Sequence, residues 1–147
     1  MNTKLNLLIA GLLTAACLDS SRVSAQTPAA AQVPEYIVID LGTLGGDYSD
    51  AHGINDRGQV VGYSKTKSGD DHGFLYTDGV MQDLGTLGGK NSYAFGINDL
   101  GQVVGWSLID NDNYHAFLYS NGFMWDLGTL GGSRSFAFGI NERGQVV

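Results

Sequence analysis

The side chains that first suggest chemistry in this chain are serines, histidines and aspartates that recur together at a constant step. The set is Ser49, Ser92, Ser135, His72, His115, Asp40, Asp83 and Asp126. A serine, a histidine and an aspartate form the nucleophilic triad of many hydrolases, but one active site needs that triad only once. Because these residues return along the chain, we expect them to pair between strands, as buried polar groups do, and we predict no catalytic residue.

Acidic residues gather in two loop segments whose sequences differ from each other. Alternating carboxylate and amide oxygens suit Ca²⁺, which takes several oxygen ligands. The segment Asp110-Asn111-Asp112 has this alternation but lacks the later Gly and Glu of a calcium-loop signature, so a solvated acidic loop is the alternative. Asp110 and Asp112 are thus the candidates for Ca²⁺, and no other cofactor is indicated. Since loops often carry binding, the candidate ligand-binding residues are Asp70, Asp71, Asp110, Asp112 and Tyr114.

Aromatic side chains offer a second kind of binding chemistry. Tyr48, Tyr93, Tyr114 and Trp125 can stack against sugar rings, or they can pack between sheets. The glycine-rich words are not phosphate loops, because residues 42–46 lack the Lys of a nucleotide loop and no helix comes after them to receive an anion.

The elements that would position these residues are predicted from an internal repeat. The word Asp-Leu-Gly-Thr-Leu-Gly-Gly begins at Asp40, Asp83 and Asp126, a step of 43 residues, and the words Gly-Ile-Asn and Gln-Val-Val keep the same step. No residue is inserted or lost between copies. A fixed period of about 40 to 45 residues predicts an array of one supersecondary unit.

Each copy predicts four strands joined by turns or short loops. In the middle copy they are Ala94–Asn98, Gln102–Leu108, His115–Tyr119 and Phe123–Leu127, all rich in β-prone residues. Asn121-Gly122 is a strong hairpin signal, and Gly101 suits a left-handed position in a longer hairpin loop. Four strands in about 43 residues make a blade. The predicted fold is therefore all-β, with tandem four-stranded repeats of 43 residues in a partial β-propeller.

The two ends of the repeat region do not match. Tyr36–Leu41 is predicted as a strand and corresponds to the last strand of a copy, whereas the sequence stops at Val147 within a copy. Two complete and two partial blades cannot close a ring, and open arrays leave unpaired strand edges. We therefore expect this chain to be a fragment of a longer protein.

The N-terminal segment predicts export. Residues 1–25 resemble a signal peptide, with a basic Lys4, an apolar run from Leu5 to Ala16 and a small-residue cleavage site before Gln26. The alternative is lipidation at Cys17. The apolar run is too short to anchor the chain across a membrane. Residues 26–34 are predicted to be a flexible leader and residues 35–147 the repeat domain. The expected location is extracellular, on the cell surface or periplasmic.

Charge narrows the choice of partner. The formal net charge is −7, and such a surface repels phosphate backbones, so no nucleic-acid partner is expected.

The repeated words resemble those of the HAF family of probable extracellular bacterial repeats. The resemblance rests on Asp126–Gly132, Gly96–Asn98, Gly101–Gly105 and His115–Phe117, and it covers about residues 36–147; the copy at His72 departs, with Gly73 in place of Ala. It implies secreted or surface-exposed tandem repeats, propeller-like, with no established reaction. No catalytic residue can be assigned from it.

The expected function is that of a non-enzymatic exported repeat protein, a binding or surface-display module that acts through loops on its blades. Neighbouring blades place variable loops along shared rims, so several weak contacts can add to one site. The expected partner is a glycan or a cell-surface protein. Two alternatives stay open: a purely architectural surface spacer, and a polysaccharide-acting propeller enzyme with its active site at a central channel.

Overall fold

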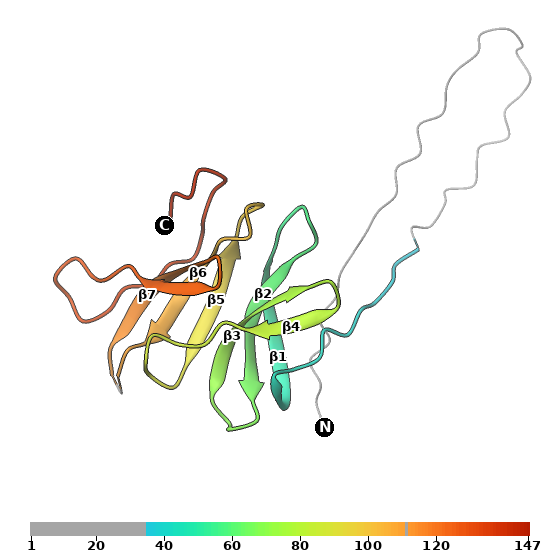
Figure 1. The fold of residues 1–147 in the computed structure, drawn as a ribbon, viewed down its shortest axis with the longest axis horizontal. Coiled ribbons are helices and arrows are strands. Elements are labelled where there is room, and N and C mark those ends of the chain that lie inside the picture. The colour runs from blue at the N-terminus through green and yellow to red at the C-terminus, as the bar shows by residue number, and fades with distance from the viewer. Residues whose placement is uncertain (1–34, 111) are drawn as a thin grey trace, which may run out of the picture.

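The computed structural model describes residues 35–110 and 112–147 and shows two four-stranded antiparallel sheets (Figure 1). The first sheet has the order β1 (Gly45–Ile54), β2 (Val60–Thr66), β3 (Asp71–Thr77), β4 (Val80–Asp83). The second has the order β5 (Ser92–Ile97), β6 (Val103–Leu108), β7 (Tyr114–Ser120), β8 (Phe123–Asp126). The described residues contain no helix, and hence none that is long and apolar enough to cross a membrane. The predicted signal peptide and leader lie outside the described residues.

Turn chemistry joins the strands as the sequence predicts. Asp78 and Gly79 both have positive φ, and so do Asn121 and Gly122, which is the requirement of the tight turn that matches strand twist. Gly101 has φ +75° and donates its N–H to the Asn98 carbonyl at 3.0 Å, as expected for a longer hairpin loop. The predicted all-β class and the four strands of the middle copy are confirmed within a few residues at their ends.

The strand predicted at Tyr36–Leu41 is wrong for this structure. Residues 35–43 belong to no sheet, and no other described segment pairs with them. A strand exists only where a neighbour accepts its backbone hydrogen bonds, so sequence propensity alone was not sufficient here.

The main core lies between the two sheets. Val61 and Leu75 of the first sheet pack against Val103, Phe117 and Ala94 of the second. Neighbouring residues of a strand point to opposite faces, so Val60 and Phe74 form a second cluster on the other face of the first sheet. A third cluster joins Val104 and Ala116 to Ala137, in the segment that comes after β8.

Equivalent positions of the repeat are buried to different extents. Leu84 leads from the first sheet into the second and is 7% exposed, whereas Leu127, 43 residues later, is 46% exposed. Leu87 is half-buried against the main core, while its counterpart Leu130 is fully exposed. The leucines of the repeated segment are therefore buried only where a complete sheet comes next among the described residues.

Candidate binding site

The recurring Asp-Leu-Gly-Thr-Leu-Gly-Gly word builds the crossing from one sheet to the next. The Asp83 carboxylate accepts the Gly85 N–H at 2.7 Å, and the Thr86 hydroxyl donates to the Gly89 carbonyl at 2.8 Å. Asp40 and Thr43, and again Asp126 and Thr129, make the same contacts. A Cβ on Gly89 would overlap the backbone and side chain of Leu108. These side chains bond to the backbone of their own segment.

The recurring histidines, aspartates and serines do not form a catalytic triad. His72 Nδ1 lies 2.9 Å from both carboxylate oxygens of Asp83, and this contact ties β3 to β4. His115 and Asp126 repeat it in the second sheet, also at 2.9 Å. Ser92 instead accepts the Gly73 N–H at 2.9 Å and donates to the Gly85 carbonyl at 2.5 Å. The histidine–aspartate pairing expected between strands is present, and the serines bond to backbone instead.

The acid of the second pair has a perturbed pKa. Burial raises the pKa of Asp126, but the Gly128 N–H and then the His115 side chain act more strongly together in the opposite direction. The pKa of Asp126 therefore lies below its ordinary value, and the carboxylate form is favoured.

The asparagine of the Gly-Ile-Asn word links one copy to the next. Asn98 is 1% exposed, and its Nδ2 donates to the Gln102 Oε1 at 2.8 Å and to the Asn141 carbonyl at 3.0 Å. Its Oδ1 accepts the N–H groups of Leu100 and Gln102 at 3.1 and 3.0 Å. Asn55 bonds to the Asn98 carbonyl in the same way. This side chain holds its own hairpin loop and the neighbouring loop together.

Aromatic side chains from both sheets gather in one continuous row of rings. We call this the aromatic row; it comprises Tyr48, His52, Tyr63, Tyr93, Phe95, Trp106, Tyr114, Phe136 and Phe138. Tyr93 stands opposite Trp106 on the paired strands β5 and β6, with ring centroids 4.1 Å apart. Tyr63 reaches Tyr93 across the two sheets at 4.9 Å. Phe95 continues to Phe138 at 5.4 Å.

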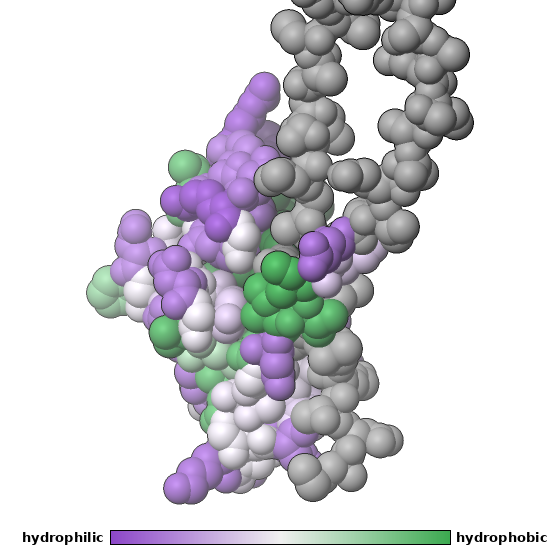
Figure 2. All heavy atoms as spheres, turned by 90° about the vertical axis from the view of Figure 1, so that its right-hand side faces the viewer, coloured by the Kyte–Doolittle hydropathy of each residue, from purple (hydrophilic) through white to green (hydrophobic). Residues whose placement is uncertain are grey.

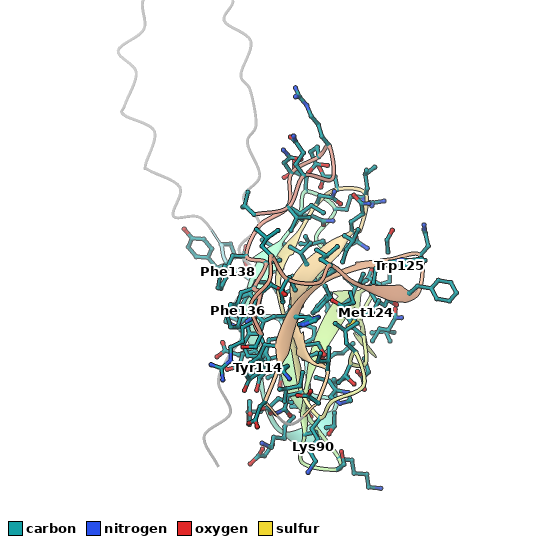
Figure 3. The ribbon with its side chains drawn as sticks, turned by 90° about the vertical axis from the view of Figure 1, so that its left-hand side faces the viewer. Lys90, Tyr114, Met124, Trp125, Phe136 and Phe138 are labelled. Atoms are coloured by element: carbon teal, nitrogen blue, oxygen red, sulfur yellow. The ribbon has the colours of Figure 1, made fainter. Side chains whose placement is uncertain are left out.

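The row occupies one edge of the molecule. In Figure 3, Tyr114, Phe136 and Phe138 lie along this edge, while Met124 and Trp125 lie on the opposite side. His52, Phe136 and Phe138 are exposed, and the remaining rings of the row are half-buried. Trp125 contacts only Phe123 among the described rings, so the structure separates it from Tyr48, Tyr93 and Tyr114.

Polar groups are fixed at the start of the row by Asp71. Its carboxylate accepts hydrogen bonds from the hydroxyls of Tyr48 and Tyr93, the latter at 3.2 Å. Lys65 Nζ lies 3.4 Å from the same carboxylate and 5.3 Å from the centre of the Tyr48 ring. Burial first, and Asp71 second, raise the pKa of both tyrosines well above the ordinary value. Both hydroxyls therefore stay protonated and act as hydrogen-bond donors at neutral pH.

The equivalent position in the second sheet has a different chemistry. Tyr114 stands where Asp71 stands in the first sheet, and its ring packs edge-on against Trp106 at 5.0 Å. Arg134 lies over the Tyr114 ring at 5.4 Å. The row thus begins with an acid–tyrosine cluster and continues as packed rings, with a cation over Tyr114.

The predicted acidic loops are occupied by contacts of their own. Asp110 accepts the N–H groups of Asp112 and Asn113, at 3.0 and 2.9 Å, and the Asn113 side-chain amide at 2.8 Å. These hydrogen bonds, with the Asp112 N–H first, lower the pKa of Asp110. Asp70 accepts a hydrogen bond from Ser68 at 2.9 Å. Across residues 35–110 and 112–147, no three His, Cys, Asp or Glu side chains converge to hold a metal ion, and the Ca²⁺ hypothesis stays a prediction.

Of the predicted ligand-binding residues, the structure places Tyr114 in the row and Asp71 against two of its tyrosines, and it leaves Asp70, Asp110 and Asp112 in the neighbouring loops. The residues that sequence reasoning missed are His52, Tyr63, Phe95, Trp106, Phe136 and Phe138. A signal for them exists in the repeat itself. The equivalent positions His52, Phe95 and Phe138 all carry a flat ring, and so do the equivalent positions Tyr63 and Trp106.

Comparison with models of protein families, with curated proteins and with solved structures found no match for this chain. The resemblance to HAF repeats therefore stays a prediction from the residues that carry it.

Proposed function

We propose that this chain is a non-enzymatic exported repeat protein that binds a glycan or a cell-surface protein through the aromatic row. The observation that carries the proposal is the sorting of residues. The polar residues that recur at 43 residues hold the sheets, whereas most positions of the row change residue type between copies, as Tyr63 and Trp106 do, and form one continuous, partly exposed surface. Variation on a connected surface is typical of recognition, because a scaffold keeps its frame while its binding positions diverge.

The chemistry of the row favours a sugar ligand. Ring faces offer apolar surface to the C–H faces of sugars, and tyrosine adds a polar tip. Asp71 and Lys65 supply charged hydrogen-bonding groups beside those rings. Ligand sites commonly combine apolar walls with a few fixed polar groups. The net charge of −7 favours a neutral ligand over a strongly acidic one.

The array that presents the row is, in this proposal, part of a β-propeller. Two sheets of four strands stack face to face, and the segment after β8 begins the same contacts again on the far face of the second sheet. The signal-like residues 1–25 support export. The HAF resemblance adds support for a surface-exposed repeat protein.

The test compares two exposed aromatic side chains on opposite edges. Phe138 belongs to the row and is 61% exposed, while Trp125 lies outside it and is 60% exposed. The full chain is assayed against cellulose, chitin, peptidoglycan and a panel of soluble polysaccharides. We expect Phe138→Ala and His52→Ala to weaken binding at least tenfold with an unchanged melting temperature, and Trp125→Ala to bind as the native chain does.

Three outcomes contradict the proposal in different ways. If Trp125→Ala loses binding and Phe138→Ala does not, the binding surface is the other edge. If no polysaccharide in the panel binds, the glycan proposal is wrong, and an architectural spacer explains the repeat better. If an added polysaccharide is shortened during the assay, the protein is an enzyme.

A further inference from the structure

Residues 37–41 stand at the sequence position of a fourth strand but belong to no sheet. They correspond, by the 43-residue step, to β4 with Leu84 and to β8 with Leu127. The Gly42 N–H donates to Asp40 Oδ1 at 2.9 Å, which is the turn that Asp83 and Asp126 make at the ends of β4 and β8. Leu41 is buried in the cluster with Val60 and Phe74. The segment is therefore anchored at its C-terminal end as a fourth strand would be.

The partner of a fourth strand is missing among the described residues. β4 pairs with β3, and β8 pairs with β7, but no described strand lies beside residues 37–41. Ile37 is 73% exposed and Val38 is 50% exposed. Figure 2 looks onto the side of the molecule where this segment enters, and apolar surface gathers there in one patch bordered by hydrophilic residues.

The missing partner has a chemistry that the two existing pairs define. Asp83 and Asp126 each receive a histidine Nδ1 from the third strand, whereas Asp40 receives none from the described residues. In both sheets the residue opposite the aspartate is the Phe of a His-Gly-Phe or His-Ala-Phe word. The aspartate thus contacts a histidine two positions before the residue it faces.

We propose that residues 37–41 are a docking edge for the third strand of a further copy of this repeat, a strand with the sequence His-Ala-Phe-Leu-Tyr. Its Phe lies opposite Asp40, its Leu opposite Ile39 and its Tyr opposite Val38, and its histidine bonds to the Asp40 carboxylate. Strand addition of this kind gains affinity from backbone hydrogen bonds and specificity from alternate side chains. This inference concerns assembly and does not depend on the aromatic row.

The backbone donors of the edge are also defined. The Leu84 N–H donates to the Gly73 carbonyl, and the Leu127 N–H to the Ala116 carbonyl, both at 2.9 Å. Hydrogen-bonded positions alternate along an antiparallel pair. The N–H groups that face the incoming strand are therefore those of Leu41, Ile39 and Ile37, and that of Val38 points away.

The experiment uses the full chain and a fluorescent peptide with the sequence of Tyr114–Ser120. Binding is followed by fluorescence anisotropy, and amide hydrogen exchange is measured at Ile37, Ile39 and Leu41. We expect the peptide to bind and to slow exchange at these three amides at least tenfold. A peptide carrying His115→Ala is expected to bind about tenfold more weakly, because a charge-assisted hydrogen bond is lost.

Variants of the protein make the register testable. Asp40→Asn in the protein should weaken binding of the native peptide as much as His115→Ala in the peptide does. The two changes together should weaken binding no more than either one alone, because both remove the same contact. Ile39→Pro removes a donor that faces the peptide and should abolish binding. Val38→Pro is the matched control, because its N–H points away, and binding should persist.

Clear results would overturn the proposal. These are a peptide that does not bind, equal binding of the native and His115→Ala peptides, or equal effects of the two proline variants. Exchange at Ile37, Ile39 and Leu41 that is already slow without peptide would also overturn it, because the edge would then be occupied.

Discussion

The asparagine ladder between copies offers a comparison within one chain. Asn98 and Asn141 stand at equivalent positions 43 residues apart and make the same bonds within their own loops. Only Asn98 adds a bond to a later copy, at the Asn141 carbonyl, and only Asn98 is buried. Replacing each asparagine by alanine therefore separates the energy of the loop from the energy of stacking.

The expected magnitudes depend on the bonds that each variant loses. Asn98→Ala removes four hydrogen bonds, at 2.8 to 3.1 Å, in a buried site. With a net value of about 1 kcal/mol for each bond, and a larger penalty where a buried partner stays unpaired, the loss is about 3–5 kcal/mol. Asn141→Ala removes three bonds in an exposed loop, where water replaces the side chain. Its loss is about 0.5–1 kcal/mol.

The assay is equilibrium unfolding in urea, with the free energy of unfolding compared among the native chain and the two variants. We expect Asn98→Ala to lower the midpoint strongly and Asn141→Ala to lower it slightly, with the same slope for both. Equal losses would show that the loop bonds dominate and that the bond between copies adds little. A loss below about 1 kcal/mol for Asn98→Ala would refute the view that this residue links the sheets.

Three further outcomes are expected. Gly89→Ala should destabilise the chain by several kcal/mol, on the order of an overpacked core site, because the added Cβ would overlap Leu108. Gly132→Ala, at the equivalent position with open space around it, should be neutral. Thermal unfolding of both variants checks this. Tyr48 and Tyr93 have raised pKa values in the folded state, so their contribution to stability is complete below pH about 10 and is lost as the pH rises toward those values. Titration of tyrosinate absorbance should show two late-ionising tyrosines, and Asp71→Asn should make both ionise earlier. Asp126 has a lowered pKa, so its contribution to stability is present above pH about 4 and is lost as the pH falls through the pKa of the folded state. Asp126→Asn should therefore reduce the loss of stability at acid pH, which unfolding measured at several pH values checks.

Strands and turns could be predicted from the sequence because the local signals agree with the fold. β-prone runs separated by Asn121-Gly122 and Asp78-Gly79 leave few alternatives to hairpins. The segment from Tyr36 to Leu41 shows where this reasoning fails. Its composition is as β-prone as that of a true strand, but pairing depends on a neighbour that local sequence does not specify.

The candidate site was predicted only in part, because side-chain direction depends on register. Loops are the usual place for variable binding residues, so Asp70, Asp110 and Asp112 were natural candidates. The rings instead lie mostly on strand faces. β1 and β5 share an irregularity in pairing at equivalent positions, between Ala51 and Gly53 and between Ala94 and Gly96. Such bulges re-aim neighbouring side chains, here next to His52 and Phe95, and their effect cannot be read from alternation alone.

The structure also explains how one frame can support different chemistry in successive copies. In the first sheet, Lys65 faces Asp71 across β2 and β3, and the two form an ion pair. At the same place in the second sheet, Leu108 faces Tyr114 across β6 and β7, in the same register. A charged pair and an apolar pair thus occupy the same backbone geometry. The serine beside each pair keeps one bond: Ser64 accepts the Leu44 N–H and Ser107 accepts the Leu87 N–H, both at 2.9 Å. Substitution at this pair therefore changes the groups beside the row, while the serine bonds next to it stay the same.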